Sequence, residues 1–110
     1  MIALILLAAS AAGCGNAATQ ADMNRCAASQ LARADAALNV QWQRTLAVNR
    51  ERSAKLIAAQ RAWINFRAAE CEAETAGSIG GSIHSMDVAA CRSRLTEDRT
   101  SQLAAIAKGR

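Results

Sequence analysis

Proline and tyrosine are absent from this 110-residue sequence, and its aromatic residues are only two tryptophans and one phenylalanine. This scarcity argues against a β-sandwich, whose sheet faces are filled by aromatic and β-branched side chains. The hydrophobic fraction of 52% comes largely from 28 alanines, and only 19 large apolar side chains follow residue 12. So thin a core gives marginal stability without cross-links, and four cysteines are available to form them.

The sequence also lacks the motifs of common catalytic and nucleotide-binding sites. Neither G-x-S-x-G, nor a P-loop, nor H-E-x-x-H occurs in it. His84 is the only imidazole, and nothing marks a nucleophile that it would activate. The cysteines contain no closely spaced pair of the zinc-binding type. We therefore predict no catalytic residues, no metal and no cofactor, and we interpret His84 as a loop or cap residue.

Residues 1–12 are apolar and uncharged, and they are too few to cross a membrane as a helix. They resemble the hydrophobic region of a secretory signal peptide, although the usual positively charged start is missing; a buried N-terminal helix is the alternative. The stretch Ala11-Ala12-Gly13-Cys14 also resembles a lipobox, which would acylate Cys14 and bring the protein to a membrane. We expect a periplasmic or secreted protein with structural cysteines, and a lipoprotein is the alternative.

Residues 13–110 are expected to form one all-α domain, a small antiparallel three-helix bundle. Thr19 and Asp22 match a capping box at the start of a helix that runs to about residue 49. Its apolar residues recur at helical spacing: Leu31, Leu38, Trp42 and Leu46. Whether this helix ends near Asn49 or continues is open, because no glycine or proline marks a break.

A second helix is expected over about 52–75 and a third helix after a glycine-rich loop. The apolar stripe predicted on the second helix comprises Leu56, Ala59, Trp63 and Phe66, widened by Ile57 and Ile64. Glycines at 77, 80 and 81 discourage any helix there. Ser82 or Ser85 is expected to cap the third helix, which should end near Gly109. Its apolar side is predicted to carry Val88, Cys91, Leu95, Leu103 and Ile106.

The four cysteines are predicted to form two structural disulfides. Folding the second and third helices back across the glycine loop brings Cys71 and Cys91 together. The pairing Cys14–Cys26 and Cys71–Cys91 is then the simplest of the three possible connectivities.

Charge is distributed unevenly along the sequence. Six Lys or Arg residues and one acid lie between residues 44 and 67, whereas four acids and no Lys or Arg lie between residues 70 and 87. In the folded-back bundle we expect a basic end at the junction of the first two helices and an acidic end at the glycine loop. A solvated surface without a partner is the alternative. Nucleic acid is not an expected partner, because no aromatic residues alternate with the cations.

Several segments of the sequence share a pattern with one known family. They are residues 19–26, residues 34–39 with Asp35 and Asn39, residues 59–67 leading to Cys71, residues 80–82, and Cys91 with Thr96 and Arg99. The most specific part is Gln60, Trp63, Arg67 and Cys71 at helical spacing. In these segments the chain resembles the LprI-like family (DUF1311) of small exported bacterial proteins. The resemblance covers nearly everything after the signal segment.

The resemblance implies roles for the shared residues. The family's cysteine positions match all four cysteines here, which favours a disulfide at Cys14 over acylation. Gln60, Trp63 and Arg67 share a helix face, so we expect Trp63 in the core and Arg67 along the helix contact. The head of Arg67 needs a carboxylate, for which Asp35 and Glu70 are the candidates, or helix-end carbonyls. Asp35, Asn39, Gln60, Trp63 and Arg67 are thus interpreted as structural.

The resemblance also implies a function, inhibition of lysozyme by protein–protein binding rather than by catalysis. Animal-type lysozymes are strongly cationic, so a chain of net charge +4 would approach them through its acidic end. The candidate contact residues there are Glu70, Glu72, Glu74, Gly80, Gly81, Ser82 and His84. The alternative is a non-catalytic envelope protein that binds anionic polymer or lipid through its basic end, or an accessory subunit.

Overall fold

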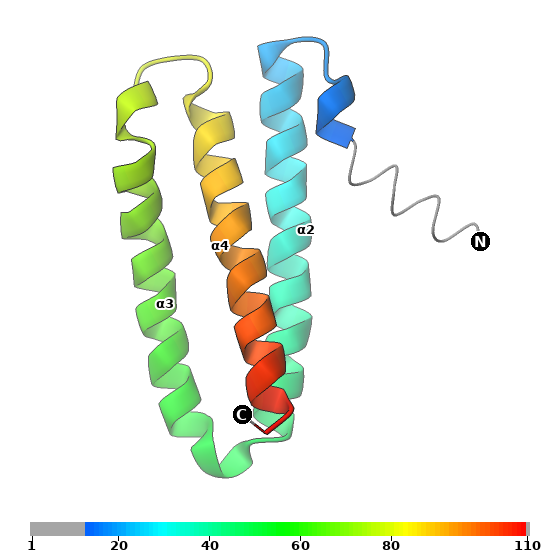
Figure 1. Cartoon of the computed structure of the whole chain (residues 1–110), viewed down its shortest axis with the longest axis vertical. Coiled ribbons are helices and arrows are strands. Elements are labelled where there is room, and N and C mark those ends of the chain that lie inside the picture. The colour runs from blue at the N-terminus through cyan, green and yellow to red at the C-terminus, as the bar shows by residue number, and fades with distance from the viewer. Residues whose placement is uncertain (1–12, 110) are drawn as a thin grey trace, which may run out of the picture.

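The computed structural model describes residues 13–109, which form three long helices and no strand (Figure 1). The helices are α2 (Gln20–Ala47), α3 (Ser53–Glu74) and α4 (His84–Ala107). Three short 3-10 turns accompany them: η1 (Gly13–Asn16), η2 (Arg50–Arg52) and η3 (Ala76–Ser78). The predicted all-α class is confirmed. The predicted signal peptide, residues 1–12, lies outside the described residues.

Successive helices run antiparallel, so the first and the last run in the same direction (Figure 1). The closest packing joins α2 and α4, and α3 packs less closely against this pair. Close approach of α2 and α4 is possible because most of the buried side chains on these two helices are short. These buried residues are Ala27, Ala34, Leu38 and Thr45 on α2, and Ala89, Cys91, Ser93, Thr96, Arg99 and Leu103 on α4.

Local signals at the helix ends were predicted in part. Thr19 caps α2, and its hydroxyl accepts a hydrogen bond from the Asp22 amide at 3.0 Å. The question left open at Asn49 is settled by a break: buried Asn49 donates to the Thr45 carbonyl at 3.0 Å, and η2 follows it. The predicted serine cap of the third helix is wrong. Ile83 holds that position without a side-chain cap, because the loop reaches α4 through consecutive turns.

The apolar stripe predicted on the second helix is also wrong in most of its members. Leu56 is buried, but Ala59, Ile57 and Ile64 are exposed, and 52% of Phe66 is accessible to solvent. The face of α3 that turns inward instead follows Leu56, Gln60, Trp63, Arg67 and Cys71. The disulfide and the polar contacts of α3 set its rotation about its own axis. Because α2 and α4 already pack closely through small residues, they leave only a narrow apolar strip for α3 to cover.

Both predicted disulfides are confirmed. Cys14 bonds to Cys26 and joins η1 to α2, while Cys71 bonds to Cys91 and joins α3 to α4 just below the glycine loop. By chain entropy each bridge stabilises the fold by about 3 kcal/mol, a large share of the stability of a small domain.

Leu103 offers a direct test of the α2–α4 contact, because its side chain is fully buried. Leu103→Ala should lower the free energy of unfolding by about 2–5 kcal/mol, through lost burial and the cavity left behind. Val40→Ala, on the exposed side of α2, should change it by less than about 0.5 kcal/mol. Urea unfolding of the oxidised protein measures both, and equal effects would contradict the described packing.

Candidate functional site

The glycine-rich segment forms a compact turn that is fastened at both sides. The Ser78 hydroxyl lies 3.0 Å from His84 Nδ1, and the side-chain amide of Asn24 on α2 donates to the Ser82 carbonyl at 3.0 Å. Gly80 has a φ of 88°, a backbone conformation that residues with a Cβ rarely adopt, so the turn requires glycine there. His84 therefore begins α4 and holds the loop, as its interpretation as a loop or cap residue predicted.

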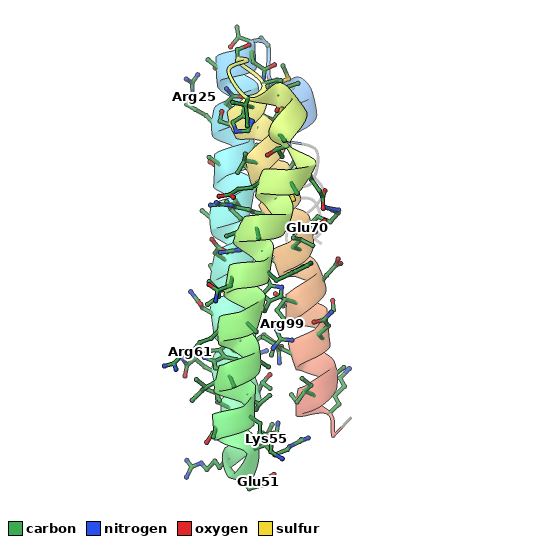
Figure 2. The ribbon with its side chains drawn as sticks, turned by 90° about the vertical axis from the view of Figure 1, so that its left-hand side faces the viewer. Arg25, Glu51, Lys55, Arg61, Glu70 and Arg99 are labelled. Atoms are coloured by element: carbon green, nitrogen blue, oxygen red, sulfur yellow. A yellow bond between two sulfur atoms is a disulfide. The ribbon has the colours of Figure 1, made fainter. Side chains whose placement is uncertain are left out.

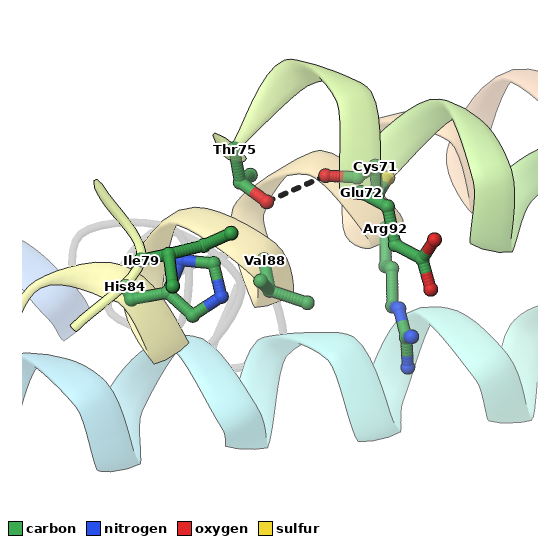
Figure 3. A pocket seen from close by; sticks show the side chains of 7 residues that line it. All are labelled: Cys71, Glu72, Thr75, Ile79, His84, Val88 and Arg92. Carbon is green, nitrogen blue, oxygen red and sulfur yellow. Dashed lines mark hydrogen bonds between the residues drawn. The ribbon is translucent and has the colours of Figure 1, made fainter. Parts of the chain in front are cut away.

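Beneath this loop lies a pocket of about 280 Å³ (Figure 3). Two predicted contact residues, Glu72 and His84, line it together with Cys71, Thr75, Ile79, Val88 and Arg92. The Thr75 hydroxyl donates to the Cys71 carbonyl at 2.6 Å and closes the end of α3. Gly80, Gly81 and Ser82 are exposed in the turn itself. The structure thus brings most of the predicted contact residues to one end of the molecule.

The acids at this end are partly neutralised, which the sequence alone did not reveal. Glu74 pairs with Arg94 of α4 at 2.6 Å, and Asp22 pairs with Arg25 at the start of α2. Figure 2 shows Arg25 and Glu70 toward the loop end, and Lys55 and Glu51 at the opposite end. Residues 70–87 and residues 44–55 lie at opposite ends of the bundle (Figure 1), but Arg25 of α2 and Arg94 of α4 reduce the negative charge of the loop end.

Glu70 and Glu74 lie one helical turn apart and interact. A side-chain hydrogen bond to Glu74 raises the pKa of Glu70 above its usual range, and partial desolvation and the repulsion of the Glu74 carboxylate act in the same direction. Arg94 opposes this rise in the pKa. Glu72, in contrast, lines the pocket beneath the loop.

Two isoleucines at this end were not among the predicted contact residues. The side chains of Ile79 and Ile83 are 71% and 41% exposed, on either side of the glycine turn. The sequence indicated that both isoleucines could be exposed, because neither belongs to the apolar stripe of a predicted helix. We call the set Glu72, Ile79, Gly80, Gly81, Ser82 and Ile83 the loop-end surface.

A second cluster gathers the residues that were interpreted as structural. Arg67 Nη1 on α3 donates to Asp35 Oδ1 on α2 at 2.8 Å and to Thr96 Oγ1 on α4 at 2.7 Å. The Arg67 guanidinium lies 4.9 Å from the centre of the Trp63 ring. The expectation that Arg67 reaches Asp35 is confirmed, and Glu70, the other candidate, forms no ion pair with Arg67 within residues 13–109.

The sequence predicted Trp63 in the core, and this prediction is wrong. Trp63 is half-buried at the edge of a groove. This groove between α2 and α3 encloses about 310 Å³. Its lining comprises Asp35, Leu38, Asn39, Trp42, Gln60, Trp63, Ile64 and Arg67. The core prediction failed because Trp63 faces the wider gap between α2 and α3, and not the close α2–α4 contact.

Comparison with known proteins decides the relationship that these residues suggested. A family model described as "Lysozyme inhibitor LprI" matches residues 11–103. The chain belongs to the LprI family. An uncharacterized protein of Rhizobium meliloti (strain 1021) is similar to this LprI-family chain, with 33% identity over 82% of the chain and 75% of that protein. No solved structure matches the chain.

Within residues 13–109, no group of three or more His, Cys, Asp or Glu side chains is placed to hold a metal ion. None of the helices in the same range has the length and apolar character needed to cross a membrane.

The Glu70–Glu74 interaction can be tested by titration. Glu74→Gln should lower the pKa of Glu70 toward its usual value, whereas Glu51→Gln at the other end should leave it unchanged. Because the pKa of Glu70 is raised in the folded protein, its contribution to stability is full at acid pH and is lost as the pH rises through that pKa. Carboxyl-carbon NMR against pH measures the shift. A Glu70 pKa that is insensitive to Glu74 would contradict the pairing.

Proposed function

We propose that this protein inhibits lysozyme by binding it through the loop-end surface, and that it does so as an exported, non-catalytic protein of the bacterial envelope. Membership of a family of lysozyme inhibitors supports the activity. The observation that supports the surface is the pair of exposed isoleucines, Ile79 and Ile83, at a fastened turn, together with Glu72 of α3, which lines the same pocket as Ile79.

The loop-end surface combines two features that protein interfaces use. Ile79 and Ile83 supply apolar area whose burial favours association. Glu72 carries a negative charge that attracts a cationic partner and raises the rate of encounter. Since the whole chain is positive, this local charge has to face the partner during approach.

Binding through this surface would cost little conformational entropy, because the loop is already ordered. The Cys71–Cys91 disulfide lies directly below the turn, the Asn24 amide donates to the Ser82 carbonyl of the turn, and the Ser78 hydroxyl contacts the His84 ring. A loop that is already fixed loses less conformational entropy on binding than a mobile loop does. Gly80 and Gly81 bear no side chains, so a partner can approach the backbone closely.

The loop-end surface makes a charge-specific prediction. Glu72→Lys should weaken inhibition of a cationic lysozyme by about tenfold, mainly through slower association at low salt. Glu51→Lys changes the net charge equally at the opposite end and should have a much smaller effect. The measurement is lysozyme inhibition together with association rates at two salt concentrations.

An apolar pair of variants separates contact from charge. Ile79→Ser should weaken inhibition by about tenfold, mainly through faster dissociation, as expected for an apolar residue at the centre of an interface. Val40→Ser, an exposed position on the outer side of α2, is the matched control. If the Glu72 and Glu51 variants act alike and Ile79→Ser inhibits like the parent, the loop-end surface is not the contact.

A second candidate function is favoured by one observation at the basic end. An apolar groove of about 420 Å³ is floored by alanines and by Val48, which is 61% exposed, and Arg44 and Lys108 flank it. Such a surface fits an anionic lipid, because acyl carbons meet the apolar floor and the headgroup meets the cations. Binding of an anionic surface polymer would use the cations alone.

The lipid candidate predicts binding to phosphatidylglycerol vesicles that Arg44→Glu weakens by about tenfold. Arg61→Glu, an equal charge change on the exposed side of α3, should have a smaller effect. Co-sedimentation measures both, with dextran sulfate as the polymer arm. Absence of binding to vesicles and polymer alike would eliminate this candidate and leave the inhibitor proposal untouched.

A further inference from the structure

We propose that the groove between α2 and α3 binds a neutral oligosaccharide. The proposal does not rest on lysozyme inhibition, because the groove lies along the helices and shares no residue with the loop-end surface. It rests on the side chains that line the groove and on the atoms that their internal contacts leave available.

Both tryptophans of the chain, Trp42 on α2 and Trp63 on α3, line this groove and are half-buried. Each indole offers an apolar face and one N–H donor. The guanidinium of Arg67 lies against the Trp63 ring and restricts its orientation. Rings held in this way can stack on the C–H faces of sugar rings.

The polar side chains of the groove are positioned by contacts on their far sides. Arg99, which lies between α3 and α4 (Figure 2), donates through Nε to Gln60 Oε1 at 2.8 Å. The amide NH₂ of Gln60 has no hydrogen-bond partner within residues 13–109, although it is not sealed from solvent. Arg99 thus acts as a positioning residue that leaves Gln60 as a donor toward the groove.

Asp35 and Asn39 on α2 complete the polar set. Asp35 Oδ1 accepts a hydrogen bond from Arg67 Nη1, Oδ2 stays available as a second acceptor, and the side chain is 43% exposed. Asn39 is exposed, and no side-chain hydrogen bond involves it in the described range, so it offers both donors and an acceptor. A sugar hydroxyl both donates and accepts, which matches this mixture.

The charge and backbone of the groove narrow the class of ligand. Asp35 and Arg67 neutralise each other, so the groove favours neither an anion nor a cation. Its walls are helices whose backbone groups are already hydrogen-bonded internally, so an extended peptide would find no main-chain partners there. The lining residues extend over about 10 Å of each helix, and a volume of about 310 Å³ is in the range of small-ligand sites.

The test uses the intrinsic fluorescence of the oxidised protein, because its only two tryptophans both line the groove and it has no tyrosine. Titration with N-acetylchitotriose and with cellotriose should shift or quench this emission, and the two arms distinguish an N-acetylated from a plain glycan. Asn39→Ala should weaken binding by about tenfold through a lost hydrogen-bonding group. Gln43→Ala, an exposed amide on α2 outside the groove, should bind like the parent.

The proposal would be overturned if neither saccharide changed the emission at millimolar concentration. Equal affinities of Asn39→Ala and Gln43→Ala would also overturn it, because binding would then not involve the groove. If trialanine changed the emission as strongly as the saccharides, the groove would be a peptide site. Asn39→Ala should leave lysozyme inhibition unchanged, so failure of this proposal and failure of the inhibitor proposal are distinguishable.

Discussion

The arrangement of the three helices depends on Arg67, which contacts the other two helices at once. Its Nη1 reaches Asp35 on α2 and Thr96 on α4, and its planar group lies over Trp63. A guanidinium can do this because it offers several donors in a rigid plane on a long apolar stem. These contacts hold α3 with a polar line inward, which explains why Phe66 and Ile64 remain exposed on a helix with so few large apolar residues.

The remainder of the fold compensates for a small apolar core. Short residues let α2 and α4 pack closely, and buried hydroxyls satisfy carbonyls there, as Thr45 does with Leu103 at 3.0 Å. Arg99 is buried beside Gln60, and desolvation lowers its pKa. Two disulfides then limit the unfolded chain, which stabilises a domain whose hydrophobic burial is modest.

This construction separates three surfaces on one small molecule. The loop end is rigid because a disulfide and two hydrogen bonds fasten it, and it exposes isoleucines beside an acid. The groove between α2 and α3 is open because Trp42, Trp63 and Arg67 are too large for close helix contact. The opposite end carries Arg44, Arg50, Arg52, Lys55 and Lys108, none of which forms an ion pair in the part of the chain that the structure describes. Because the three surfaces are separate, a substitution at one of them leaves the other two intact.

Local features of the sequence determined the helix number, the Thr19 cap, the glycine loop and the disulfide pairing, because each depends on residues close in the chain or on a simple fold-back. The sequence also included Asp35 among the candidate partners of Arg67. Tertiary structure alone decided the rotation of α3, the half-exposure of Trp63 and the pairing of Glu74 with Arg94. Those outcomes depend on helices far apart in sequence, whose polar contacts outweighed a weak apolar periodicity.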